Sequence, residues 1–167
     1  LFSKESAITL IAILPMTLWF FTAATGKTIM KAGLAFMGVG IIFLLIRYMV
    51  IGSFAGNYQL QLVNNSLVGT PDLIQRFSSA IYIMGRYLLL LFLPVTLVFD
   101  YSYNSIPIVG PASVKFIFPF IIYTSLLWIA VRGFLKKDII SFGILFFLAT
   151  ISLVANILFL IEATMAE

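Results

Sequence analysis

The sequence predicts an all-α integral membrane protein, a polytopic bundle of helices. Of its 167 residues, 62% are hydrophobic and 10% are charged, whereas soluble globular domains are roughly 45–50% apolar and about 25% charged. Apolar stretches recur at close to the roughly 20 residues that a helix needs to cross about 30 Å of hydrocarbon. The charges between these stretches are mainly basic, as is typical of the connections that orient membrane helices.

Four apolar stretches are predicted to be transmembrane helices. They cover residues 6–25, 32–52, 115–131 and 139–161. A fifth apolar segment, residues 79–99, carries Gly85-Arg86 near its start and Pro94 near its end. The remaining residues of the region 53–114 are rich in Gly, Pro, Asn and Gln, which are typical of loops.

Orientation follows from two short basic connections. Residues 26–31 contain two lysines, and residues 132–138 contain one arginine and two lysines, so both are expected on the cytoplasmic side. If all five apolar segments crossed the membrane, these connections would lie on opposite sides. We therefore expect residues 79–99 to lie along the outer interface or to enter and return, with a fifth crossing as the alternative. The region 53–114 and both chain ends then face outside, and 1–167 forms one partial transmembrane domain.

Composition excludes several kinds of chemistry. The chain has no cysteine and no histidine, which removes disulfides, thiol catalysis, the usual zinc sites and histidine acid–base catalysis. No metal site is assigned, and a divalent-metal requirement stays open. The net charge of +4 comes from connections between helices and does not indicate nucleic-acid binding. Because the chain begins at Leu1 and stops without a terminal tail, we expect it to be a piece of a larger protein.

Charged residues in a membrane chain are candidates for function because they are costly to keep there. Lys4 could hold a phosphate while Glu5 orients a hydroxyl; the alternative is a pair that anchors the helix at the interface. Arg86 could bind an anion at the start of the fifth apolar segment, and Arg47 and Arg76 could either do the same or extend to the headgroups.

The densest polar and aromatic cluster is residues 100–104. Asp100, Tyr101 and Tyr103 could bind a sugar, with the rings against its apolar face and the polar groups on its hydroxyls. The alternative is an aromatic belt followed by a turn. These residues alone do not name a reaction.

Six local strings, in order along the chain, are more specific. They are LFSKESAI at 1–8, VNNSLVG at 63–69, GRYL at 85–88, FLPVTLVFDYSYNSIP at 92–107, ANILFLI at 155–161 and MAE at 165–167. This set resembles bacterial relatives of the transmembrane, tetratricopeptide-repeat-containing protein O-mannosyltransferases, whose membrane part has the GT-C fold. The resemblance covers the latter half of that membrane part. Glu162 departs from the family, which often has glycine there.

The resemblance implies a glycosyltransferase that takes a sugar from a polyprenyl-phosphate donor at the non-cytoplasmic face, in a bacterial inner membrane, with the active face periplasmic. The acceptor would be a protein or a glycan, and tetratricopeptide repeats would follow the last span. The catalytic acid would lie upstream, so this piece alone should be inactive. The residues expected to bind donor or acceptor are Lys4, Glu5, Arg86, Asp100, Tyr101, Tyr103 and Glu167.

Two other functions are compatible with a membrane chain. One is a non-catalytic anchor or scaffold that carries tetratricopeptide repeats for protein interaction. The other is a transporter, which predicts inverted repeats and helices broken near the midplane; neither pattern occurs in the sequence.

Overall fold

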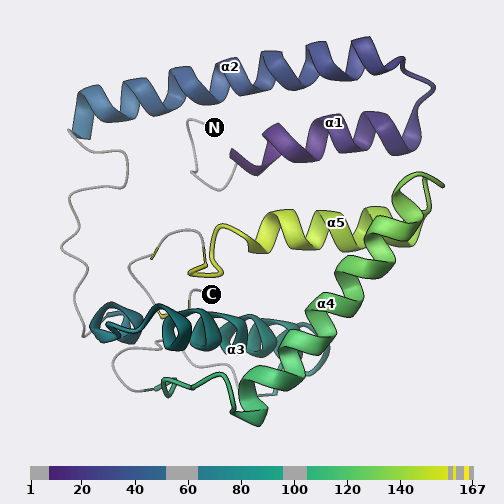
Figure 1. Cartoon of the computed structure of the whole chain (residues 1–167). Coiled ribbons are helices and arrows are strands. Elements are labelled where there is room, and N and C mark those ends of the chain that lie inside the picture. Colours follow the sequence, from purple (N-terminus) through teal and green to yellow (C-terminus); the bar gives the residue numbers. More distant parts are fainter. Residues whose placement is uncertain (1–7, 52–63, 96–104, 158–159, 161–163, 166–167) are drawn as a thin grey trace. The chain divides into compact units, whose positions relative to one another are not determined.

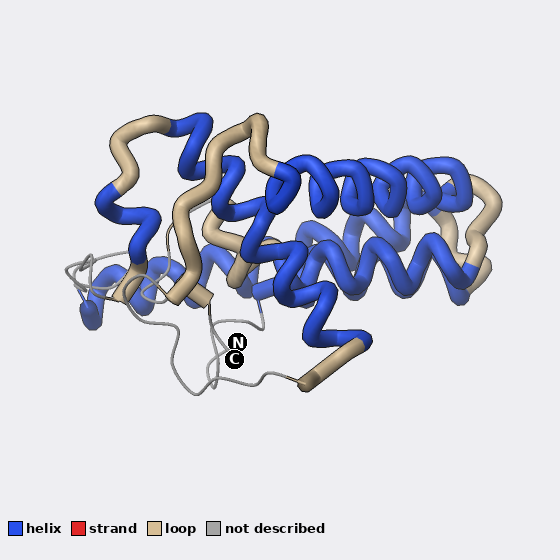
Figure 2. Tube along the Cα trace, turned by 90° about the horizontal axis from the view of Figure 1, so that it is seen from below, coloured by secondary structure: helices blue, strands red, loops and turns tan. Residues whose placement is uncertain are grey.

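The computed structural model describes residues 8–51, 64–95, 105–157, 160 and 164–165. The regular structure of this part is entirely helical, as predicted (Figure 2). In chain order the elements are α1 Leu10–Phe21, α2 Gly26–Ile51, the 3-10 helix η2 Ser66–Gly69, α3 Leu73–Phe92, α4 Val114–Phe134 and α5 Ile139–Ile151 (Figure 1). The chain divides into two compact units, Leu1–Tyr58 with Leu126–Thr150, and Gln59–Ser125 with Ile151–Glu167.

Two helices of the described part are long and apolar enough to cross a membrane, not the four that the sequence predicted. They are Gly26–Val50 in α2 and Val114–Phe134 in α4. The helices α1 and α5 are apolar but have 12 and 13 residues, which is about 18–20 Å of helix against the roughly 30 Å of a hydrocarbon core. The 20-residue helix α3 is not among the candidates.

The early end of α5 is explained by the tertiary contacts of the residues that follow it. The sequence predicted a span over residues 139–161, but the helix stops at Ile151 and the chain turns. Five residues later Asn156 adopts a left-handed backbone conformation with φ 56°, which asparagine tolerates better than most residues. Its amide is buried in a polar network of the second unit, so this part of the apolar run cannot continue as a helix.

In the first unit, α1 and α2 form an antiparallel hairpin with a close contact (Figure 1). Gly33 and Gly40 lie seven residues apart and therefore share one face of α2. A Cβ at Gly33 would lie 3.4 Å from Pro15 Cγ, and one at Gly40 would lie 2.5 Å from Ile11 Cδ1. Small residues at such positions let two helix backbones approach closely, as is common in membranes.

The same unit brings its two basic connections together. Lys137 Nζ, in the α4–α5 turn, donates a hydrogen bond to Thr22 O at the end of α1, over 3.2 Å. In the opposite direction Trp19 Nε1 donates to Phe134 O at the end of α4, also over 3.2 Å. The rings of Trp19 and Phe134 stack with centroids 5.8 Å apart. The α1–α2 and α4–α5 connections therefore lie at one end of this unit (Figure 1).

Candidate functional site

The second unit gathers sequence strings that lie far apart along the chain. Its buried core consists of Leu67, Ile83, Ile106 and Met165, against which Tyr82, Tyr87, Leu90 and Leu160 pack. Leu67, Tyr87 and Ile106 belong to three different strings of the resemblance, and Leu160 and Met165 to the last two. Residues of these five strings therefore meet in one core.

A network of buried polar side chains accompanies this core. Asn65, Thr164 and Asn156 expose 0%, 1% and 2% of their surfaces. Asn65 Nδ2 donates to Asn156 Oδ1 over 3.0 Å, and Asn156 Nδ2 donates to Thr164 O over 3.0 Å. Buried amides need such partners, because an unpaired polar group in a dry interior costs about 1–3 kcal/mol.

The string VNNSLVG supplies the other half of the network. Asn65 Oδ1 accepts a hydrogen bond from Leu67 N over 3.0 Å and so caps η2. Ser66 N donates to Thr164 Oγ1 over 3.1 Å, and Thr164 N donates to Asn64 O over 3.1 Å. The segment that follows α5 is thereby fastened to residues almost 100 positions earlier.

Helix α3 crosses α4 at a glycine. A Cβ added at Gly85 would lie 2.5 Å from Pro119 Cγ and 2.8 Å from Pro119 Cβ, so no larger residue fits. Beside this contact Tyr123 Oη donates to Met84 O over 2.9 Å. The absence of a side chain at Gly85 sets how closely the two helices approach.

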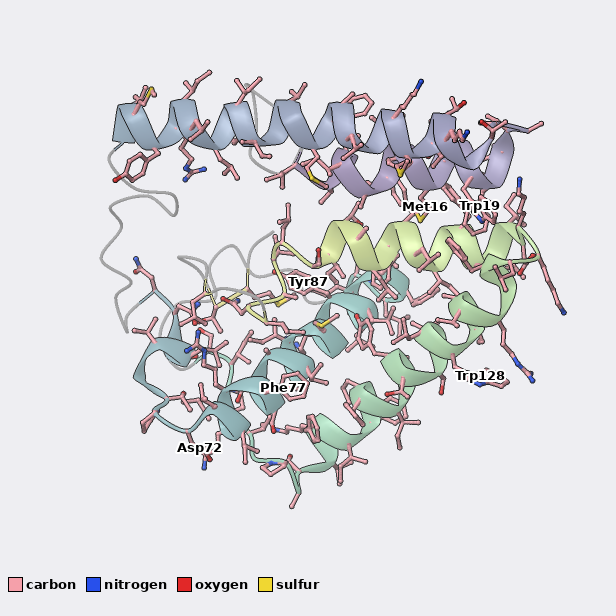
Figure 3. The ribbon with its side chains drawn as sticks, turned by 45° about the horizontal axis from the view of Figure 1, so that its top comes forward. Met16, Trp19, Asp72, Phe77, Tyr87 and Trp128 are labelled. Carbon is pink, nitrogen blue, oxygen red and sulfur yellow. The ribbon has the colours of Figure 1, made fainter. Side chains whose placement is uncertain are left out.

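The loop before α4 is also tied to α3. Ser79 Oγ accepts from Val109 N over 2.9 Å and donates to Val109 O over 3.3 Å, and both residues are buried. The buried positions of α3 are Ser78, Ser79, Ala80, Ile81, Ile83 and Met84. Large apolar side chains nearer its two ends, such as Phe77 and Leu89, are exposed, and Figure 3 labels Phe77 and Tyr87 along this helix.

Arg86 is the predicted site residue that the structure describes. It is half-buried on α3, next to Gly85 and Tyr87, and its Nε is buried with no hydrogen-bond partner in the described part of the protein. A guanidinium carries five hydrogen-bond donors and no acceptor. A buried N–H without a partner costs folding free energy, and an acceptor that binds there would recover it. Phosphate and carboxylate are the acceptors that arginine binds best.

The other predicted site residues lie outside the described residues. They are Lys4, Glu5, Asp100, Tyr101, Tyr103 and Glu167. Within the residues that are described, no group of three acidic side chains is placed to hold a metal ion. Sequence reasoning missed Asn65, Asn156 and Thr164, although an asparagine within an apolar run was a usable signal of a buried polar contact.

Comparison with known proteins gives one match. Residues 59–127 match the family model described as Protein O-mannosyl-transferase TMTC, DUF1736. No curated protein and no solved structure matches the chain. The matched segment nearly coincides with the continuous part of the second unit, Gln59–Ser125. The match supports a relation to the TMTC family and, with the two long apolar helices, indicates a membrane protein related to O-mannosyltransferases.

Proposed function

We propose that this chain is part of a membrane glycosyltransferase of the GT-C type, which transfers a sugar from a polyprenyl-phosphate donor to a protein or glycan. The observation that carries the proposal is the TMTC match over 59–127. The match covers α3, where the buried Nε of Arg86 has no hydrogen-bond partner among the described residues. Mannose is the sugar to test first, since the matched family is described as an O-mannosyl-transferase.

The proposed reaction takes place on the face opposite the two basic connections. These connections lie at one end of the first unit, joined by Lys137 and Trp19. If that end is cytoplasmic, α2 leaves the cytoplasmic face and α4 returns to it, so the residues between them belong to the periplasmic side of a bacterial inner membrane. On this topology α3 lies along the outer interface, which suits a helix that is buried on one side and less apolar than α2 and α4.

Arg86 is proposed to bind the phosphate of the lipid-linked donor. Its guanidinium would neutralise the charge of the phosphate in surroundings partly shielded from water, where a charge-assisted bond is stronger. We assign the other predicted contacts with donor and acceptor to Lys4, Glu5, Asp100, Tyr101, Tyr103 and Glu167. The acid that activates the acceptor hydroxyl is proposed to come from residues outside this chain, and the acceptor-binding repeats to follow it.

The test is sugar transfer by the full-length protein reconstituted in vesicles, with radiolabelled mannosyl polyprenyl phosphate as donor and membrane proteins as acceptors. Arg86→Gln should raise the KM for the donor by about 10- to 150-fold, because a hydrogen bond to a charged group contributes about 1.5–3 kcal/mol. Arg86→Lys keeps the charge but loses the planar fork of the guanidinium. Its donor KM should therefore lie between that of the unsubstituted protein and that of Arg86→Gln.

Lys115→Gln is the matched control, since it removes an exposed cation from the same unit. Lys115 lies over the Tyr82 ring, 5.8 Å from its centroid, and its loss should leave the donor KM within about twofold, as for most surface substitutions. An unchanged KM in Arg86→Gln would remove Arg86 from the site. No transfer by the unsubstituted protein, with mannose or any other sugar donor, would favour the scaffold.

A further inference from the structure

The end of the first unit that carries both connections is strongly basic. Five cations stand on or next to these connections, against one carboxylate, Asp138. The cations are Lys27, Lys31, Arg132, Lys136 and Lys137, and all five are exposed. We call these five residues the basic end.

The basic end is a single site because the two connections are fastened to each other. Lys137 Nζ and Trp19 Nε1 each donate to the last carbonyls of the opposite helix pair, Thr22 O and Phe134 O. These donors satisfy carbonyls that would otherwise add negative partial charge at the two helix C-termini. The other four cations are exposed and remain available to a ligand.

Two of the cations lie over indole rings. Arg132 Cζ is 4.2 Å from the centroid of the Trp128 ring, and Lys137 Nζ is 4.9 Å from that of Trp19. Trp128 is 57% exposed and neighbouring Leu135 is 80% exposed. In Figure 3, Trp19 lies beside the connections and Trp128 lies further back along α4, where it contacts Arg132.

This combination fits the boundary between hydrocarbon and headgroups. Tryptophan prefers that depth, exposed apolar side chains extend toward the acyl chains, and the ammonium and guanidinium groups reach outward. Basic clusters next to membrane helices attract acidic lipids, because each Lys or Arg near the surface adds attraction that salt screens within about 8 Å.

We propose that the basic end is a binding site for the phosphate headgroup of an anionic phospholipid, with Arg132 and Lys136 as the contacting cations. Arg132 is held over Trp128 with its edge exposed, so its N–H groups can meet two phosphate oxygens. Lys136 is an exposed cation four residues later, in the turn that follows α4. The proposal does not depend on sugar transfer.

The two tryptophans provide the experiment, because Trp19 and Trp128 are the two tryptophans of the sequence and each lies against a cation of the basic end. The full chain is reconstituted in phosphatidylcholine vesicles that contain a minor fraction of brominated lipid, either phosphatidylglycerol or phosphatidylcholine. Bromine quenches a nearby indole. We expect the phosphatidylglycerol form to quench about fivefold more effectively, the factor for one basic residue at an anionic surface, and high salt to reduce this ratio.

Arg132→Gln and Lys136→Gln should each lower the ratio of the two quenching constants toward one. Lys115→Gln is the matched control, since it also removes an exposed cation from above an aromatic ring, Tyr82, and should leave the ratio unchanged. Taking a ratio cancels any change that Arg132→Gln causes in Trp128 emission itself.

Three results would overturn the proposal: equal quenching by the two brominated lipids, a ratio that survives both substitutions, and a ratio lost equally in the Lys115 control. Far-UV circular dichroism confirms that each variant keeps its helices. Since both substituted side chains are exposed, a change in the ratio with unchanged helicity reports on lipid binding.

Discussion

Replacing Asn156 by alanine should open the second unit at its carboxyl-terminal segment. The change deletes the bond accepted from Asn65 Nδ2 and the bond donated to Thr164 O, both 3.0 Å. It removes one hydrogen-bond partner from the buried Asn65 amide and one from the buried Thr164 carbonyl, at about 1–3 kcal/mol each. Alanine at φ 56° adds about 1 kcal/mol of backbone strain relative to asparagine. The expected loss is about 3–7 kcal/mol of local stability.

Glycine and aspartate at the same position separate these contributions. Asn156→Gly deletes the same two bonds but accepts a positive φ, so it should recover about 1 kcal/mol relative to alanine. Asn156→Asp keeps an acceptor for Asn65 and puts a carboxylate oxygen against Thr164 O. The order of local stability should be asparagine first, then glycine, then alanine, with aspartate below asparagine because it buries a charge.

The absence of cysteine from the chain makes a local assay possible. Met165 is 3% exposed in the same core, so Met165→Cys places one buried thiol next to the network. The rate at which a maleimide labels it in detergent reports the free energy of local opening. Adding Asn156→Ala should accelerate labelling by at least about a hundredfold, since 1.4 kcal/mol corresponds to a factor of ten.

Thr124→Ala is the control, because Thr124 Oγ1 donates within its own helix to Phe120 O and is exposed. It should change the labelling rate of Met165→Cys by no more than about twofold. If Asn156→Ala labels no faster than this control, the network does not hold the segment after α5. Equal labelling rates for Asn156→Gly and Asn156→Ala would refute the backbone strain assigned to alanine at position 156.

Two further predictions concern the packing of α3. Gly85→Ala should destabilise the second unit by about 1–3 kcal/mol in thermal unfolding, because the new Cβ would overlap the rigid ring of Pro119. Gly38→Ala is the control, since nothing lies within 4 Å of its added carbon, and it should be neutral or slightly stabilising in the same measurement. Ser79→Ala should abolish hydrogen-exchange protection of the Val109 amide, whose 2.9 Å acceptor it removes, while the amides in the interior of α4 keep theirs.

Composition was sufficient to predict that the regular structure is helical. Helix α4 was predicted within three residues at each end, whereas α2 begins at Gly26, six residues before the predicted span, so the connection predicted at 26–31 is wrong and its lysines lie in the first turns of α2. Residues 32–52 and 115–131 correspond to α2 and α4, because an apolar run that ends at Gly, Pro or charge has few alternatives to a helix. The span predicted at 139–161 was too long. Its end depends on Asn156, whose partner Asn65 lies 91 residues away, and hydropathy along the chain contains no such pairing.

The candidate site shows the same division. Arg86 could be singled out, since an ionisable residue in an apolar segment stands out by type alone, and its role in a site stays a prediction. For the polar network, the sequence signal was Asn156 within an apolar run. Its pairing with Asn65 and Thr164 could not be predicted, because only folding brings the three residues together. Gly85 lies in one of the family strings. The reason why this position needs glycine is the ring of Pro119 on another helix, and that contact cannot be read from the sequence.

The strings that carry the family resemblance thus contain two kinds of residue, those explained by the fold and one that is not. Asn65, Gly85 and Asn156 are explained by packing and hydrogen bonding inside the second unit, so a likeness at these positions argues for a shared fold. Arg86 is different, since its buried Nε has no partner in the described part of the unit and folding alone gives no reason to keep it. A relative that retained the asparagines and the glycine but carried an apolar residue at the position of Arg86 should therefore fold alike and fail to bind the lipid-linked donor. The assignment of Arg86 to the donor site thus depends on its own chemistry, whereas the proposal of an enzyme depends on the TMTC match.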